Sequence, residues 1–185
     1  KNRLSLSVAA GFFYTHDFHH PNTMNEYSVT VCDQDGIITL TREDLLKYTG
    51  YGNVIAAALM IRVCKAAFDR LSPSEPVNRR ELYWTLGFCG PGILDCVEMI
   101  SLAIREGRCL QKPMLDHPQA PMSIGGQFVF DITYRNRSVR IWPDARIFDD
   151  EFREQVANWQ DKPVSEERQA FLEYKHRKVS QILNE

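Results

Sequence analysis

The stretch Leu86–Arg108 reads LGFCGPGILDCVEMISLAIREGR, and it joins two different hydrophobic patterns. Apolar residues that alternate along the chain lead into it, as in a strand with one buried face: Leu82, Trp84, Leu86 and Phe88. Beyond the glycines, apolar residues recur at helical spacing, which predicts an amphipathic helix that ends near Gly107. We therefore expect a strand, a tight turn and a helix, with the rest of the chain packed around this unit.

The turn between this strand and this helix is Cys89-Gly90-Pro91-Gly92. The start of a helix presents free backbone N–H groups, and its dipole lowers the pKa of a nearby thiol. In that interpretation Cys89 is a thiolate ligand or a nucleophile. In the other interpretation, which we favour, Cys89 is a small buried residue of a tight turn.

The remaining elements alternate between hairpins and helices. The dipeptide Asp35-Gly36 lies between two strand-like runs and predicts a hairpin, and Thr41 is placed to cap the helix that follows. The run Val54–Leu71 has one apolar stripe and several alanines, which indicates a buried central helix. A second hairpin is predicted within 127–142, followed by two helices. The pattern predicts an α+β fold, with an antiparallel sheet packed against central helices and a C-terminal helical pair.

Length and composition indicate one domain that spans residues 1–185. With 185 residues, of which 44% are hydrophobic, the chain can bury a core but is too short to divide into several domains. We expect residues 1–41 to form an N-terminal arm and hairpin extension, and residues 148–185 to form the terminal helices. The apolar start, Lys1–Phe13, is interpreted as part of the folded domain, and the alternative is the remnant of a signal sequence.

Charge and cysteine content narrow the function classes. A net charge of −2 without a basic stripe argues against nucleic-acid binding. No apolar run reaches the length of a membrane span, so we expect no membrane partner. Five cysteines without a paired framework favour a reducing, cytoplasmic location. Small molecules and other proteins remain as expected partners.

Histidines gather near the N-terminus. Three of the five histidines, His16, His19 and His20, lie within five positions. One turn of helix would direct two of them the same way, which makes the segment a candidate metal-binding or acid–base loop, and a surface arm is the alternative. If the segment folds over the Cys89 turn, the four side chains offer mixed nitrogen and sulfur ligands, which suit zinc. We therefore predict a metal site formed by His16, His19, His20 and Cys89.

A second glycine turn, Thr49-Gly50-Tyr51-Gly52-Asn53, precedes the central helix. Thr49, Tyr51 and Asn53 offer two hydroxyls and an amide, and the turn offers backbone donors. These three residues are candidates for binding a cofactor or another small-molecule ligand. The alternative is a turn that only leads into the helix. No residue is assigned a catalytic role, and whether the chain is an enzyme stays open.

From Tyr48 onward, the order of features resembles the FmdE family of formylmethanofuran dehydrogenase components. The shared pattern is a glycine turn into an alanine-rich helix, a strand, a Cys-Gly turn into a second helix, a hairpin and two terminal helices. The segments that carry it are Lys47–Tyr51, Ala56–Arg62, Cys89-Gly90 with Asp95–Glu98, Phe128–Arg135, Val139–Ile141 and Phe152–Leu183. The resemblance covers roughly three quarters of the chain by eye. It implies an α+β core and a homodimer that forms through this core.

The sequence departs from the family at the position of the family's site. FmdE proteins carry His-Gly-His-x-Cys-Pro-Gly at the first glycine turn, where this chain has Thr49, Tyr51 and Asn53. The resemblance implies an FmdE-like metal-binding protein, accessory to or enzyme-like in one-carbon or molybdenum- or tungsten-related metabolism, in which the His-rich arm replaces the missing ligands. The alternative is a non-catalytic module with a degenerate site that binds a small molecule or a protein.

Overall fold

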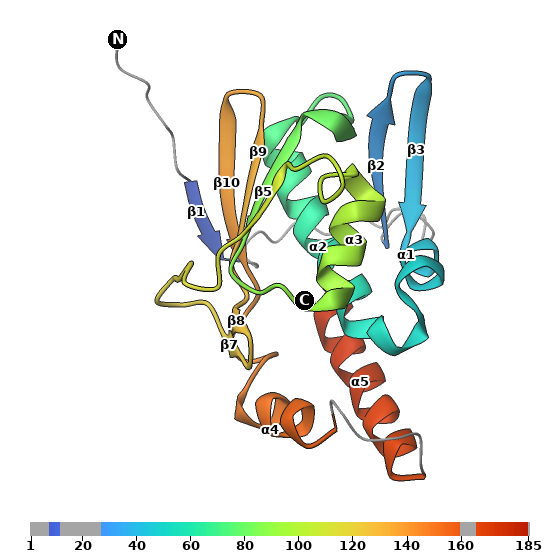
Figure 1. Cartoon of the computed structure of the whole chain (residues 1–185), viewed down its shortest axis with the longest axis vertical. Coiled ribbons are helices and arrows are strands. Elements are labelled where there is room, and N and C mark those ends of the chain that lie inside the picture. Colours follow the sequence, from blue (N-terminus) through green and yellow to red (C-terminus); the bar gives the residue numbers. More distant parts are fainter. Residues whose placement is uncertain (1–7, 12–26, 160–165, 185) are drawn as a thin grey trace.

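The computed structural model describes residues 8–11, 27–159 and 166–184 (Figure 1). Over these residues the helices are α1 (Arg42–Thr49), α2 (Val54–Leu71), α3 (Pro91–Ser101), α4 (Asp150–Trp159) and α5 (Glu166–Asn184). The strands are β1 (Val8–Gly11), β2 (Ser28–Asp33), β3 (Gly36–Thr41), β4 (Val77–Asn78), β5 (Leu82–Leu86), β6 (Cys109–Gln111), β7 (Met122–Ser123), β8 (Gly126–Gln127), β9 (Phe130–Tyr134) and β10 (Arg137–Trp142). Within these ranges, no helix combines the length and the apolarity that a membrane crossing requires.

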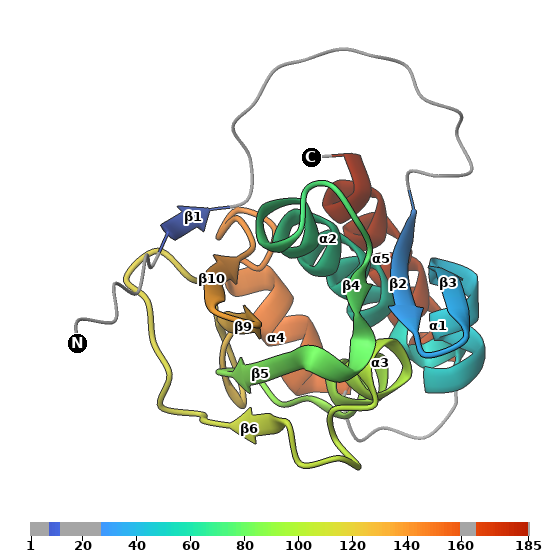
Figure 2. The same ribbon diagram turned by 90° about the horizontal axis from the view of Figure 1, so that it is seen from above.

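The larger sheet has five strands in the order β1-β10-β9-β5-β6. Strands β10, β9 and β5 are antiparallel neighbours, as the sequence predicts, while β1 and β6 add parallel strands at the two edges. Leu82, Trp84 and Leu86 of β5 are buried in the main core, on the face against which α2 and α3 lie (Figure 2). The α+β class is confirmed, and the sheet is mixed at its edges.

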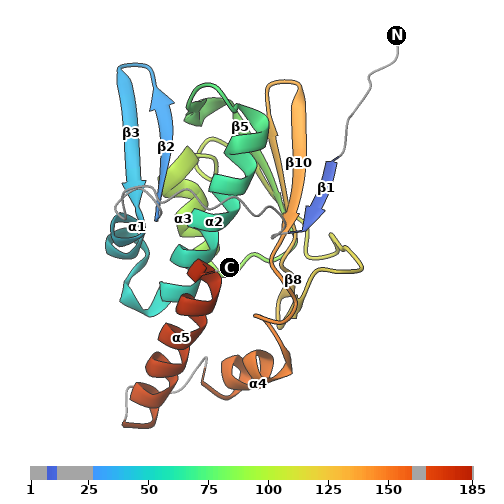
Figure 3. The same cartoon turned by 180° about the vertical axis from the view of Figure 1, so that it is seen from behind.

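A three-stranded sheet, in the order β3-β2-β4, lies on the other side of the helices (Figures 1 and 3). Its first two strands form the predicted hairpin, in which Asp33 pairs with Gly36 at the turn. Val29, Val31 and Leu40 are buried in the main core from this side. Helices α2 and α3 are therefore a middle layer between two sheets.

Helix α2 is the centre of the core. Its bounds, Val54–Leu71, are those that the sequence predicts, and its alanines Ala57 and Ala58 are fully buried. It contacts α1, α3 and α5 as well as β2, β9 and β10. Helix α5 packs along α2, and α4 contacts α5, which confirms the terminal helical pair.

Helix α3 ends earlier than the sequence predicts. It stops at Ser101 because Leu102 enters the left-handed region with a φ of 56°, so the expected end near Gly107 is wrong. The carboxylate of Glu98 accepts two backbone N–H groups of the loop that follows, at 2.9 and 3.1 Å. In a longer helix, these backbone N–H groups would donate to carbonyls one turn earlier. Here they donate to Glu98 instead, which stabilises the early end of α3.

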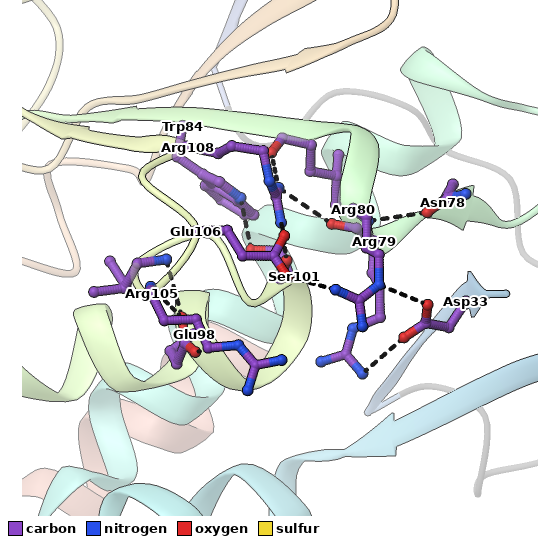
Figure 4. Close-up of polar contacts among 12 residues, drawn as sticks. Asp33, Asn78, Arg79, Arg80, Trp84, Glu98, Ser101, Arg105, Glu106 and Arg108 are labelled. Atoms are coloured by element: carbon purple, nitrogen blue, oxygen red, sulfur yellow. Dashed lines mark hydrogen bonds and ion pairs between the residues drawn. The ribbon is translucent and has the colours of Figure 1, made fainter.

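An arginine cluster holds this end of α3 against the strands of both sheets (Figure 4). Arg79 donates to the carbonyl of Met99 in α3 at 2.6 Å. Arg80 pairs with Asp33, at the β2–β3 turn, at 2.9 Å, and it also pairs with Glu106 beyond α3. Because these guanidinium groups have internal partners, the cluster is a structural joint between the layers.

Candidate functional site

The fold brings together the two glycine turns that the sequence singles out. A methyl group on Gly92 would lie 2.8 Å from Cγ of Asn53, so the turn before α2 and the start of α3 are in direct contact. The side-chain amide of Asn53 donates to the carbonyl of Thr49 at 2.6 Å. Tyr51 is 63% exposed and donates from its hydroxyl to Glu43 at 2.9 Å. Thr49 and Asn53 thus pack at the contact between the two glycine turns, while Tyr51 lies on the surface. Ligand binding by the three residues stays a prediction.

Cys89, in the second of these turns, is half-buried. Its Sγ donates to the carbonyl of Leu86 at 3.5 Å. Burial raises the pKa of the Cys89 thiol, although the backbone N–H of Lys112 acts in the opposite direction. The net direction is therefore opposite to the lowered pKa that the helix start predicts, because desolvation outweighs the backbone hydrogen bond from Lys112. Cys89 is a partly buried thiol of a tight turn.

The predicted metal site cannot be assembled from the described residues. His16, His19 and His20 lie outside them, so the distance from these histidines to Cys89 is not defined. Among residues 8–11, 27–159 and 166–184, no group of three or more His, Cys, Asp or Glu side chains is placed to hold a metal ion. Zinc binding by the histidines and Cys89 stays a prediction.

The face of the larger sheet turned away from α2 and α3 carries an ion pair at its centre. Asp131 of β9 and Arg140 of β10 lie opposite one another in register. Arg140 donates from Nε to Oδ1 of Asp131 at 2.6 Å and from Nη2 to Oδ2 at 2.8 Å. These hydrogen bonds raise the pKa of Arg140, with smaller contributions from the charges of Asp131 and Asp116, and they hold its guanidinium in one orientation.

The segment 112–121 lies against the same face of the sheet. The ring of His117 stacks on that of Trp142 in β10, with centroids 3.8 Å apart. Leu115 packs against a small apolar cluster that includes Val129 and Trp142 and is separate from the main core. The segment therefore forms a wall along one part of the sheet face.

A hollow of about 410 Å³ lies between this wall and the ion pair, and we call it the outer groove. Its lining residues are Lys112, Pro113, Met114, Leu115, Asp116 and Arg140. In the part of the chain that the structure describes, the ammonium of Lys112 and the carboxylate of Asp116 make no hydrogen bond or ion pair. Met114 is 91% exposed at the mouth of the groove. The outer groove thus combines two cations, an apolar wall and one carboxylate that has no ion-pair partner among the residues described.

Sequence reasoning missed the outer groove. The connection after β6 contains prolines and scattered polar residues but no motif, so the sequence assigns it no binding role. The available signal was the pair Asp131 and Arg140, because both positions alternate with the buried residues of the second hairpin. Opposite charges at outward positions of paired strands predict a cross-strand contact, but not the segment that packs beside it.

No protein-family model, no curated protein and no solved structure matches this chain. The FmdE resemblance and the homodimer that it implies therefore stay predictions. The function is argued below from the geometry of the site itself, because a fold class is shared by proteins of many functions.

Proposed function

We propose that the chain is a non-catalytic binding module that takes a small polar molecule in the outer groove. The observation that carries the proposal is the hollow of about 410 Å³, whose lining includes Lys112 and Asp116, two charges without an ion-pair partner among the described residues. This volume lies within the usual range for small-molecule sites, roughly 300–1,000 Å³. An unpaired charge on a concave surface can be matched by a ligand without first breaking an internal ion pair.

The lining defines the chemistry of the ligand. Lys112 and the oriented guanidinium of Arg140 favour a carboxylate, while Asp116 favours an ammonium group. Pro113, Met114 and Leu115 supply apolar contact for a side chain. A zwitterion with an apolar side chain, such as a free amino acid, satisfies all of these groups together.

The cysteines near this region favour binding over thiol chemistry. Burial raises the pKa of Cys89, and it raises the pKa of Cys109 to about 11, with a smaller contribution from Cys89. Since the thiolate is the nucleophile and the metal ligand, both groups are in their unreactive form near neutral pH.

Titration of the full chain with L-leucine tests the proposal, with amide chemical shifts as the readout. We expect shifts of the backbone amides of Lys112, Met114, Leu115, Asp116 and Arg140. Leucinamide, which lacks the carboxylate, and N-acetyl-leucine, which lacks the ammonium, should each bind about tenfold more weakly, as expected for the loss of a charged hydrogen bond.

Matched variants assign each preference to one side chain. Lys112→Ala should reduce the preference for leucine over leucinamide, with Arg140 retaining the rest, and Asp116→Asn should remove the preference over N-acetyl-leucine. Lys47→Ala, on α1 with a side chain that is 62% exposed, serves as the surface control and should change neither. Equal binding of the three compounds, or shifts that are not centred on the groove, would contradict the proposal.

Metal binding is the second candidate function, and the clustering of His16, His19 and His20 within five positions supports it. The test is the zinc content of the purified full chain. The hypothesis predicts bound zinc in the wild type and its loss in the His16→Ala/His19→Ala/His20→Ala variant and in Cys89→Ser. A metal-free wild type, or unchanged content in the variants, would remove this site.

A further inference from the structure

Strand β3 is a regular edge strand without the features that usually protect an edge. All six of its residues pair in register with β2, and β3 ends the order β3-β2-β4. Within the described part of the chain, β3 thus has a neighbouring strand on one side only. Its sequence, GIITLT, contains no charge and no proline. Natural edge strands carry such residues to prevent pairing with another chain, so their absence indicates a strand that is built to pair.

The two ends of β3 carry opposite charges. Asp35 lies in the exposed turn before β3, and Arg42 begins α1 directly after it. Neither side chain makes a hydrogen bond or an ion pair with another described residue. A second copy of β3 laid antiparallel brings the Asp35 end of each copy to the Arg42 end of the other. A parallel arrangement brings like charges together, which costs free energy.

We propose that β3 pairs with β3 of a second copy of this chain, antiparallel and about a twofold axis. The axis lies at Ile38, which faces its own counterpart, so that Ile37 lies opposite Thr39. This register sets Asp35 opposite Thr41 of the other copy, one position from Arg42, and the twofold axis repeats this arrangement at the other end of the strand pair. A shift of two residues, with Thr39 on the axis, is disfavoured because it sets Asp35 against Glu43.

Burial agrees with this arrangement. Ile37 is 69% exposed in the single chain, and Ile38 packs at the margin of the main core. Pairing covers part of both side chains and joins the two three-stranded sheets into one continuous sheet. Strand β10, which carries Arg140 of the outer groove, lies on the opposite side of the helical layer from β3 (Figures 1 and 3), so this interface and the proposed ligand site are separate.

The molar mass of the full chain in solution, measured by light scattering over a range of concentrations, tests the proposal. We expect a dimer. Thr39→Lys places an ammonium group on the exposed edge and should raise the dissociation constant of the dimer at least about tenfold. Thr30→Lys is the matched control. Its hydroxyl contacts that of Thr39 at 3.3 Å, but it lies on β2, inside the sheet, so the dimer should persist.

A charge swap tests the orientation. Asp35→Arg and Arg42→Asp should each weaken the dimer, and the double variant should restore it, because the charges attract again with their signs exchanged. Circular dichroism verifies that each variant is folded. A monomeric wild type, a dimer that tolerates Thr39→Lys, or a double variant weaker than either single one would overturn the proposal.

Discussion

Arg108 donates from Nη2 to the carbonyl of Ser101 at 2.7 Å, and Ser101 is the last residue of α3. The same guanidinium donates to the carbonyl of Leu82, the first residue of β5. Its side chain is only 9% exposed. Arg108 therefore hydrogen-bonds a carbonyl at the end of α3 and links that end to the start of β5 (Figure 4).

Arg108→Ala should lower the free energy of unfolding by about 2–3 kcal/mol, because it leaves two partly buried carbonyls without a charged donor. Urea denaturation measures this loss. Arg105→Ala is the matched control. Its side chain is 61% exposed, and its ion pair with Glu98 is long, at 3.7 Å, so the effect should stay within about 0.5 kcal/mol. A loss for Arg108→Ala as small as that of the control would contradict the assigned role.

The cap of α1 makes stability depend on pH. The hydroxyl and N–H of Thr41 donate to the carboxylate of Asp44 at 2.7 and 3.0 Å, and these bonds hold the pKa of Asp44 below its usual value. Asp44 therefore stabilises the fold above its unfolded pKa of about 3.9, and this contribution is lost as the pH falls through the lower folded pKa.

Asp44→Asn should flatten this part of the stability curve, measured by urea unfolding at a series of acidic pH values. Thr41→Ala should cost about 1 kcal/mol at neutral pH, the usual effect of losing an N-cap. Lys47→Ala should change the curve less, because Lys47 lies 3.7 Å from Asp44 and lowers its pKa by a smaller contribution than Thr41 does. Identical curves for Asp44→Asn and the wild type would show that the cap does not titrate.

The contact between the two glycine turns predicts an intolerant position at Gly92. Its added methyl would lie 2.8 Å from Cγ of Asn53 and 3.0 Å from Cβ of Ala56, so Gly92→Ala should destabilise by about 1–3 kcal/mol through overpacking. Gly52→Ala meets nothing within 4 Å and should be neutral or slightly stabilising. Thermal unfolding measures both.

A second substitution identifies the clash. Asn53→Ala removes the two nearest crowding atoms and leaves Cβ of Ala56, so the loss in Gly92→Ala/Asn53→Ala should be smaller than the sum of the two single losses. Additive losses would mean that Gly92 is required for a reason other than its contact with Asn53.

The raised pKa values of Cys89 and Cys109 predict slow alkylation. Near pH 7 both should react slowly with iodoacetamide, and the rate should rise steeply with pH as thiolate forms, with Cys109 titrating at about 11. Mass spectrometry of peptides after timed labelling measures each site. Prior treatment with a chelator should leave the Cys89 rate unchanged, whereas a clear increase would support the metal hypothesis.

Much of the fold could be predicted because its signals are local. Asp35-Gly36 marks one hairpin, and the stripe of Val54–Leu71 sets both ends of α2. The end of α3 escaped prediction because it depends on Leu102, which adopts a positive φ without being glycine, and on Arg108 from beyond the helix. Contacts from later residues overrode a helical pattern that continues past Ser101.

The candidate site was less predictable than the fold. The sequence singled out the turn at Asn53 and the turn at Cys89 separately, and only the structure shows that Asn53 contacts Gly92 of the second turn. The outer groove depends on how residues 112–121 lie across the sheet. That placement rests on the stacking of His117 on Trp142, a tertiary contact with no counterpart in local sequence pattern.

The order of strands in the larger sheet has a consequence for folding during synthesis. Val8 of β1 pairs with Val139 of β10, so β1 has no place in the sheet until β10 has been made. The hairpin of β2 and β3 needs no residue beyond Thr41 and can form much earlier. Because distant pairings are slow to close, the attachment of β1 should be a late event in folding, with the hairpin and α2 already present.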